Sequence, residues 1–245
     1  MRQLSWDGCH NVRDLGGLPL AGGGETRYGA VVRADSLSEL TAEGWSEALD
    51  YGVQRVVDLR FAEERARDVG AAPVEVVHVS LFGDRDPVKD REWEEATRSV
   101  DDLTDVFAAL YVETIDDNSA QVVRALNAVA EGDSGCVAVH CFAGKDRTGV
   151  VSALVLSLAG VEHDVIVRDF AASDEGVLEL CAEWIASAKD NTERAYRKRL
   201  LTAPAAAMAM MLAHLDAAWG GAHSYLLAQG VEEDTVGQLR ARLAS

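Results

Sequence analysis

The segment HCFAGKDRTG at 140–149 carries residue types and a spacing suited to phosphate chemistry. Five residues separate Cys141 from Arg147, which is enough for the backbone to curl into a loop whose N–H groups point inward. The N-terminus of a following helix would add further N–H groups and the positive end of its dipole. Arg147 supplies a planar fork that contacts two phosphate oxygens at once. The segment therefore predicts a loop that binds a dianion and favours a thiolate at Cys141.

The elements around this segment place it where ligands bind. CVAVH at 136–140 is typical of a short buried strand, and the apolar run from Thr148 onward predicts a helix. In α/β proteins, ligands bind outside the carboxyl end of a strand. A structural cysteine in a glycine turn is the simpler alternative. The joint spacing of His140, Cys141, Arg147 and Thr148 is too specific for that, so we expect Cys141 to be a nucleophile.

The segment resembles HCxxGxxRTG, the signature loop of cysteine-dependent protein tyrosine phosphatases, and in particular of the bacterial atypical, PtpB-like tyrosine and lipid phosphatases. NVRDLGG at 11–17, VVRAD at 31–35, VVDLR at 56–60 and the C-terminal GVEEDTVGQLRARL resemble the same family. The resemblance implies that Cys141 attacks phosphorus, that a cysteinyl-phosphate forms, and that water hydrolyses it. The phosphoryl oxygens would be bound by the loop residues Phe142, Ala143, Gly144, Lys145, Asp146 and Arg147. No metal or other cofactor is required.

A general acid must protonate the leaving oxygen, and two regions offer carboxylates. Asp146 stands beside the arginine, as in the GKDR form of the resembled group, and is the favoured candidate. Asp84 is the alternative, since it follows the predicted strand that ends at Phe82. Asp84 and Asp86 also fit a solvated acidic turn around Pro87.

Other residues near the loop have a functional and a structural interpretation. Thr148 is a candidate to hydrogen-bond the Cys141 sulfur and ease its departure, or is simply a helix-cap hydroxyl. We expect the His140 side chain to orient the loop by hydrogen bonds to the backbone rather than to transfer protons. Lys145 is expected as a second cation at the mouth of the site, which the resemblance associates with phosphoinositide head groups, or as a solvent-facing lysine.

More distant polar residues are candidates for supporting the site. Asn11, Arg13 and Asp14 either brace the loop or form a structural Asx-turn. Asp58 and Arg60 are expected to pair within the scaffold, with Glu63 or Glu64 as further partners. A disulfide from Cys136 or Cys181 would protect Cys141 if either cysteine lies within reach.

Strand and helix patterns alternate along the first two thirds of the chain and predict an α/β fold. Strands are expected near 31–35, 53–60, 74–82 and 136–140, and helices after Thr41, at 119–132 and from 148. Between 84 and 117, twelve acidic and four basic residues predict solvated helices with one apolar stripe. That stripe carries Trp93, Val100, Leu103, Phe107, Leu110 and Tyr111.

The last third of the chain shows only helical patterns. We therefore expect a single tyrosine phosphatase-like domain over 1–245, with a central, mainly parallel sheet flanked by helices and a C-terminal all-helical elaboration. Its apolar stripe from Met208 to Trp219 is typical of core packing. Helices of this region cover the active site in the resembled group, so 176–218 is a candidate lid.

Composition narrows the function further. With 23 Lys and Arg against 41 Asp and Glu, the net charge of −18 disfavours nucleic acid and anionic membranes as partners. Four cysteines form no disulfide framework, and the first twenty residues hold no signal-like apolar run, so a cytoplasmic location is expected. The longest apolar run, 150–161, is shorter than the roughly 20 residues that span a bilayer, so no stable membrane insertion is expected.

The expected substrate is a phosphotyrosine protein or peptide, with phosphoserine, phosphothreonine or phosphoinositide as further possibilities. A rhodanese-like sulfurtransferase also uses a cysteine in an anion-binding loop, but that loop is typically shorter. A catalytically silent module that binds phosphorylated partners is the other alternative. The sequence makes no prediction about oligomeric state.

Overall fold

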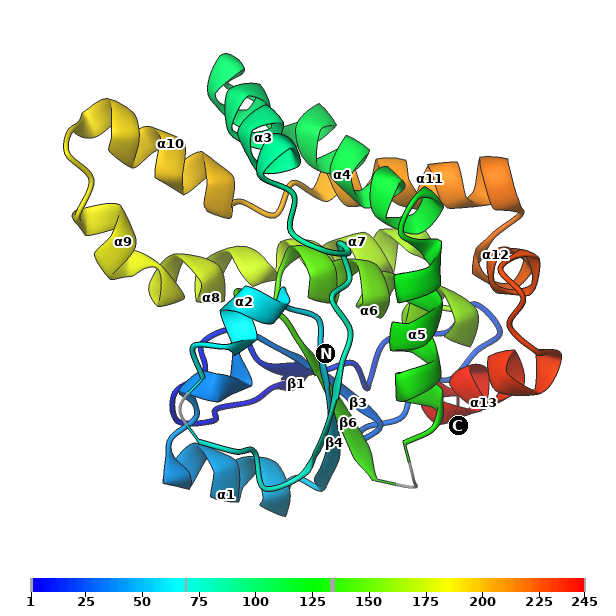
Figure 1. The fold of residues 1–245 in the computed structure, drawn as a ribbon. Helices are drawn as coiled ribbons and strands as arrows, with labels where there is room; N and C mark the ends of the chain where they lie inside the picture. Colours follow the sequence, from blue (N-terminus) through cyan, green and yellow to red (C-terminus); the bar gives the residue numbers. More distant parts are fainter. Residues whose placement is uncertain (1, 69, 133–134, 245) are drawn as a thin grey trace.

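A six-stranded, mainly parallel sheet forms the centre of the fold in the computed structural model (Figure 1). The structure describes residues 2–68, 70–132 and 135–244. The strands lie in the order β1-β2-β3-β6-β4-β5, in which β3, β6, β4 and β5 are parallel and β1 and β2 antiparallel. Their bounds are β1 Arg2–Gln3, β2 Arg13–Asp14, β3 Val31–Ala34, β4 Val53–Asp58, β5 Glu75–His78 and β6 Cys136–His140.

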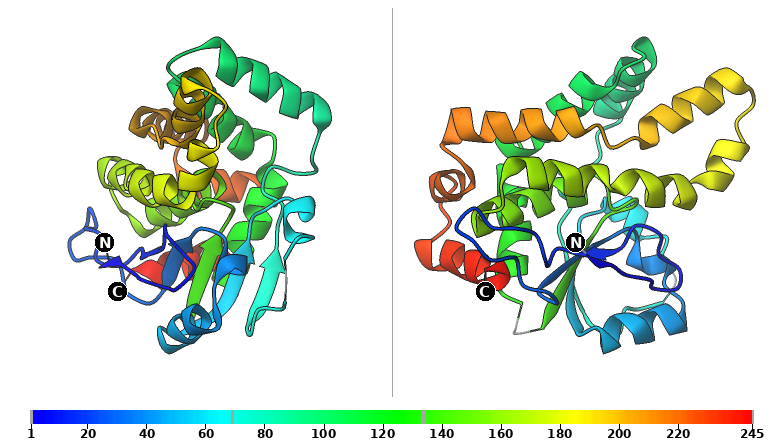
Figure 2. Two further views of the ribbon diagram at one scale, coloured as in Figure 1. Left: turned by 90° about the vertical axis from the view of Figure 1, so that its left-hand side faces the viewer. Right: turned by 180° about the vertical axis from the view of Figure 1, so that it is seen from behind.

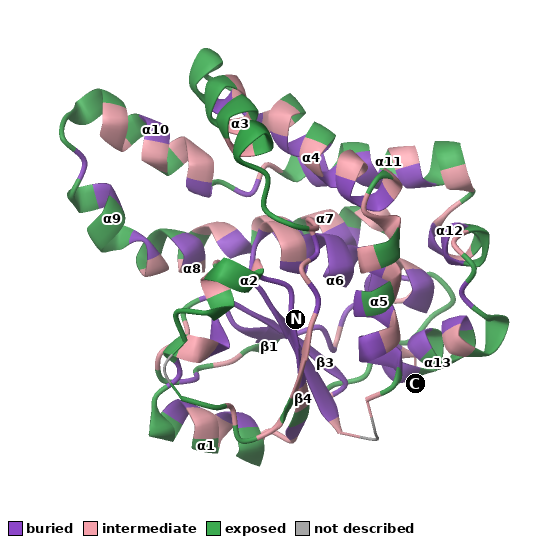
Figure 3. Cartoon of the chain, viewed as in Figure 1, coloured by how far each residue is buried: buried purple, intermediate pink, exposed green. Residues whose placement is uncertain are grey.

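Helices cover the two faces of the sheet unequally (Figure 2). Alternate residues of β6 point to opposite faces, so that Val137 and Val139 join the larger core while Cys136 and Ala138 join a smaller one. The smaller core is closed by α1 (Ala42–Asp50), whose N-cap Thr41 accepts a hydrogen bond from the Gly44 amide. The central strands β3 and β6 and most of β4 are buried (Figure 3), as their β-branched runs predict.

The remaining helices follow the strands or form the C-terminal third. They are α2 Ala62–Arg65, α3 Pro87–Ser99, α4 Thr104–Asp116, α5 Ser119–Ala130, α6 Asp146–Ala159, α7 His163–Ala171, α8 Ser173–Leu180, α9 Ala182–Ala186, α10 Asn191–Leu201, α11 Ala205–Trp219, α12 Ala222–Ala228 and α13 Glu233–Leu243. In α11, Met208, Met211 and Leu215 are fully buried in the larger core. Helix α11 therefore packs into the core of the sheet, as its apolar stripe predicts.

One stretch, Asn191–Trp219, meets the length and composition of a membrane-crossing helix. It comprises α10 and α11, which are separated by the non-helical residues 202–204. The buried methionines and leucines of α11 explain its apolar composition through core packing.

Helices α8, α9 and α10 form an arm that leaves the body beside α7 and returns to α11 (Figures 1 and 2). The arm has a small apolar cluster of its own, formed by Val177, Cys181, Ile185 and Leu201. Ala143 of the loop after β6 packs against this cluster. The arm is thus in contact with the segment expected to bind phosphate.

Three expectations about the elements need correction. The strand predicted over 74–82 is confined to β5, although Val79 and Leu81 beyond it are buried. Val100 ends α3 and is 39% exposed, so it does not belong to the apolar stripe. Helix α6 begins at Asp146, two residues earlier than the apolar pattern indicates, because its first turn carries the polar loop residues.

Candidate active site

The loop 141–145 joins the central strand β6 to the buried helix α6. It lies at the carboxyl end of the strand, where the sequence places it. Gly144 has φ +66, and a Cβ there would lie 2.6 Å from the Ala34 carbonyl group. Only glycine fits this conformation and this close approach.

The carbonyl groups of the loop are held from behind by neighbouring segments. The Asn11 side chain donates to the Ala143 carbonyl at 2.8 Å, and Arg33 donates to the Gly144 carbonyl at 2.8 Å. The Ser36 amide donates to the Phe142 carbonyl at 3.0 Å. Because N–H and C=O point in opposite directions across a trans peptide, these bonds turn the loop amides toward the other side, as an anion site requires.

Arg33 also belongs to a cluster of buried charged side chains. Arg13 and Arg33 both pair with Asp169 of α7, at 2.9 and 2.6 Å, and all three side chains are 1% exposed. Burial and the neighbouring Arg13 charge lower the pKa of Arg33 to about 10. Burial works to raise the pKa of Asp169, but the two arginines outweigh it and lower the value. The cluster thus holds two cations on one shared carboxylate behind the loop.

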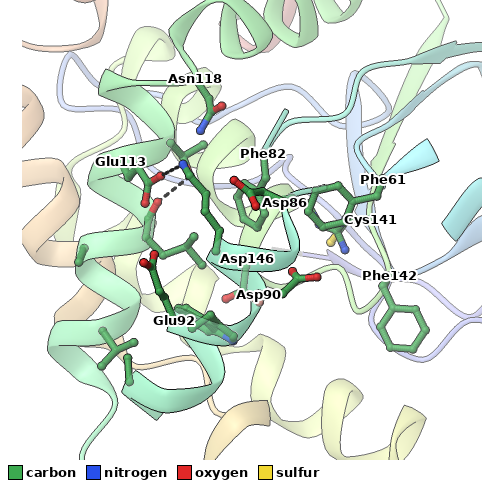
Figure 4. Close-up of a pocket in the computed structure, with 18 of the residues that line it drawn as sticks. Phe61, Phe82, Asp86, Asp90, Glu92, Glu113, Asn118, Cys141, Phe142 and Asp146 are labelled. Atoms are coloured by element: carbon green, nitrogen blue, oxygen red, sulfur yellow. Dashed lines mark hydrogen bonds and ion pairs between the residues drawn. The ribbon is translucent and has the colours of Figure 1, made fainter. Parts of the chain in front are cut away.

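Cys141 and Arg147 line one cavity of about 780 Å³. Its other walls come from α3, α4, the segment before α3, and the rings of Phe61 and Phe82. Figure 4 shows both rings beside Cys141. No residue of the candidate lid, 176–218, is among the described residues that line this cavity, so the lid role stays a prediction.

Arg147 is oriented by Glu64 of α2. Its two terminal nitrogens donate to the Glu64 carboxylate at 2.5 and 3.0 Å, and the Phe61 and Phe82 rings lie 5.4 and 5.7 Å from the guanidinium carbon. Burial works to lower the pKa of Arg147, but attraction from Cys141 and Glu64 outweighs it and raises the value. Burial likewise works to raise the pKa of Glu64, and Arg147 lowers it.

The favoured acid, Asp146, lines the same cavity and is held on two sides. The Tyr111 hydroxyl donates to its carboxylate at 2.5 Å, and the Lys145 ammonium group lies 3.1 Å away. Burial and the Asp146 charge raise the pKa of Tyr111 well above its ordinary value. The two contacts fix the position of the Asp146 side chain at the wall of the cavity.

Lys145 does not stand at the mouth of the site, so that expectation is wrong. The residue is 2% exposed, and its ammonium group donates to the carbonyls of Leu200 and Thr202 at 3.3 and 2.7 Å. The Phe107 ring lies 4.0 Å from the same nitrogen. The side chain turns inward because the carbonyls at the end of α10 lack helical partners and accept its protons.

The alternative acids lie in the segment before α3. Asp84 and Asp86 both line the cavity. Asp86 caps α3 by accepting from the Val88 amide at 2.8 Å, whereas Asp84 is exposed. Asp84 therefore remains the second candidate, and Asp86 has a structural role.

The structure gives His140 and Thr148 different surroundings. His140 is buried, with Nδ1 3.2 Å from the Cys141 carbonyl and Nε2 3.6 Å from Asp58, an arrangement suited to orienting the loop. Burial lowers the pKa of His140 despite Asp58. The buried Thr148 hydroxyl makes no hydrogen bond within the described ranges, the Cys141 sulfur included.

Two residues predicted near the site lie away from it. Asp14 accepts from the amides of Gly16 and Gly29, so it holds the N-terminal turn rather than the loop. Cys136 begins β6, about 16 Å from Cys141 at roughly 3.3 Å per strand residue, which is too far for a disulfide. Cys181 belongs to the arm cluster against Ala143, and its protective role stays a prediction.

A cysteine and an arginine that flank five loop residues, between the central strand of a mainly parallel sheet and a buried helix, define the class of cysteine-dependent phosphatases. A sequence model of the tyrosine phosphatase family matches residues 4–245, and the chain belongs to that family. It is a phosphatase enzyme, and its family acts on phosphorylated proteins or lipids.

Two relatives cover most of the chain. A tyrosine-protein phosphatase of Nostoc commune is 30% identical over 231 residues, which span 87% of this chain and 74% of the relative. The triple specificity protein phosphatase PtpB of Mycobacterium tuberculosis is 30% identical over 273 residues, which span 96% of this chain and 97% of the relative.

Most of the contacts that orient the site cannot be predicted from the sequence. Arg60 pairs with Asp58, as expected, but its further partner is Asp68 rather than Glu63 or Glu64. Glu64 pairs with Arg147 instead. Tyr111 belongs to an apolar stripe, and nothing in that periodicity shows that its hydroxyl reaches Asp146. Asp169 lies within a helical run that gives no sign of two buried arginines.

Proposed function

We propose that this enzyme hydrolyses phosphotyrosine in proteins or peptides through a cysteinyl-phosphate on Cys141. The observation that carries the proposal is the placement of Phe61 and Phe82 beside Cys141 and Arg147 in one cavity. Two aromatic walls next to a phosphate loop suit a phosphorylated phenyl ring. Phosphoserine and phosphothreonine lack that ring, so we expect them to be hydrolysed more slowly.

The proposed first step transfers the phosphoryl group to sulfur. The Cys141 thiolate attacks phosphorus, the bond from phosphorus to the tyrosyl oxygen breaks, and Asp146 gives its proton to that oxygen. Arg147 and the loop amides hold the other phosphoryl oxygens, and they require no reorganisation because the contacts behind the loop already fix them.

The proposed second step returns the enzyme to its starting state. The Asp146 carboxylate takes a proton from water, the water oxygen attacks phosphorus, and the bond from phosphorus to sulfur breaks. Inorganic phosphate leaves, and Cys141 is again a thiolate. The buried Thr148 hydroxyl, which has no hydrogen-bond partner among the described residues, would stabilise that sulfur by turning toward it. A reduced, cytoplasmic environment would keep the thiol available.

The test is hydrolysis of p-nitrophenyl phosphate and of phosphotyrosyl peptides by the purified protein, with and without vanadate. We expect vanadate-sensitive hydrolysis that Cys141→Ser abolishes. Thiosulfate with cyanide serves as the control for sulfur transfer. Hydrolysis that survives Cys141→Ser contradicts the proposal, and binding of phosphopeptide without turnover would identify a silent binding module.

A further inference from the structure

The cavity that contains Cys141 continues along α3 and α4, and that outer part is acidic. Besides Asp146, six carboxylates line the cavity: Asp84, Asp86, Asp90, Glu92, Asp105 and Glu113. In Figure 4, Glu92 lies on the opposite side of the view from Cys141 and Phe142, and Asp86 and Asp90 lie between them. A ligand held by the phosphate loop would therefore extend toward negative charge.

The cations at the cavity are already paired. Lys89 and Arg147 are the cationic side chains among the described lining residues. Lys89 donates to Glu113, and Arg147 donates to Glu64. Lys145, the other cation near the loop, is buried against the end of α10. Within the described residues, the cavity thus presents no unpaired cation for a second phosphate group.

Several of the carboxylates are, by contrast, available to a ligand. Asp84, Glu92 and Asp105 make no side-chain hydrogen bond or ion pair with any described residue. Trp93, Val106 and Leu110 line the same part of the cavity and supply apolar surface beside them. Arginine and lysine combine an apolar stem with a charged end, which suits such a mixed wall.

We propose that this outer part of the cavity binds basic residues that flank the phosphotyrosine of a protein substrate. The inference rests on the proposed function, since the phosphate loop fixes one end of the substrate. It follows that polyphosphorylated inositol lipids are poor substrates. Once the loop holds one of their phosphates, the others would face carboxylates of like charge, which a specific site avoids.

The test compares phosphotyrosyl heptapeptides that carry either arginine, alanine or glutamate on both sides of the phosphotyrosine. We expect kcat/KM for the arginine peptide to exceed that for the glutamate peptide by about tenfold at low salt, and the ratio to shrink as added NaCl screens the charges. A soluble, short-chain phosphatidylinositol bisphosphate is the lipid probe, and it should be hydrolysed more slowly than the arginine peptide.

Two double variants test whether the carboxylates of the cavity cause the preference for the arginine peptide. The double variant Glu92→Gln/Asp105→Asn should reduce the arginine-to-glutamate ratio at least about threefold by removing two charges from the cavity wall. Glu43→Gln/Asp50→Asn removes two exposed charges from α1, on the other face of the sheet, and should preserve the ratio. Vanadate affinity of each variant shows whether the phosphate loop is intact.

Three results overturn the inference: an arginine-to-glutamate ratio near one, a preference for the glutamate peptide, or faster hydrolysis of the bisphosphate lipid. Each of them leaves the proposed phosphatase chemistry standing. Absence of hydrolysis of p-nitrophenyl phosphate and of every peptide overturns the proposed function as well. The two failures are therefore distinguishable.

Discussion

Glu64 and Arg147 form a two-point ion pair, with the terminal nitrogens of the arginine 2.5 and 3.0 Å from the two carboxylate oxygens. A pair of this geometry uses one N–H of each terminal nitrogen. It leaves the Nε side of the guanidinium free to contact a phosphate through a second fork. Helix α2, far from the loop in sequence, is thereby part of the phosphate site.

Glu64→Gln should lower kcat/KM about tenfold or more and weaken vanadate binding. The charged acceptor that fixes the guanidinium plane is lost, and hydrogen bonds to charged groups are worth about 1.5–3 kcal/mol. Steady-state kinetics and vanadate inhibition measure the effect. Glu63→Gln, the same change one residue away, is the control. A gain in activity from Glu64→Gln would instead mean that Glu64 competes with the substrate.

Asp146→Asn should make hydrolysis depend steeply on the leaving group. Rates on aryl phosphates with poor leaving groups are expected to fall by about 10²–10⁴, and p-nitrophenyl phosphate should suffer less, because its leaving group needs no proton. The measurement is kcat/KM across a series of aryl phosphates for Asp146→Asn and Asp84→Asn. If Asp84→Asn steepens the dependence and Asp146→Asn does not, Asp84 is the acid.

Lys145→Met should destabilise the protein by about 2–3 kcal/mol and loosen the arm. The substitution removes the donor for the Leu200 and Thr202 carbonyls, and buried unsatisfied groups cost about 1–3 kcal/mol each. Urea unfolding measures the loss, and limited proteolysis reports cleavage within 173–203. Lys198→Met, an exposed lysine of α10, is the control. Equal stability of the two variants would contradict a tethering role for Lys145.

Asp58 should make the free energy of unfolding depend on pH in the acid range. Burial works to raise its pKa, but hydrogen bonds from Arg60 and the charges of His140 and Arg60 outweigh it and lower the pKa from 3.8 to about 2. The folded protein therefore binds fewer protons at Asp58 than the unfolded chain does. The stabilisation is fully present above pH about 4 and is lost as the pH falls through about 2.

Urea unfolding between pH 6 and 2 measures this dependence. We expect Asp58→Asn to abolish a component of about 2 kcal/mol, at about 1.4 kcal/mol per unit of pKa. Asp50→Asn, an exposed residue of α1, should retain it. An unchanged pH dependence in Asp58→Asn would place the acid sensitivity in other carboxylates.

The sequence predicts best the features that are contiguous along the chain. HCFAGKDRTG holds the candidate nucleophile, the arginine and the favoured acid within ten consecutive residues, and the strand predicted at 136–140 coincides with β6. The pairs that orient the site join distant segments, as Lys145 joins Thr202 and Arg147 joins Glu64. Neither periodicity nor spacing shows which carbonyl or carboxylate a buried cation will meet. For that reason the sequence predicts Lys145 at the mouth of the site, whereas the structure buries it against the end of α10.

The cluster of Arg13, Arg33 and Asp169 draws one charged residue each from β2, β3 and α7. Replacing Asp169 would leave two buried arginines without their shared carboxylate, and such losses typically cost about 3–5 kcal/mol. Both arginines thus depend on one residue of a distant helix. We expect a relative that lacks Asp169 to have replaced Arg13 or Arg33 as well, so that these positions change together during evolution.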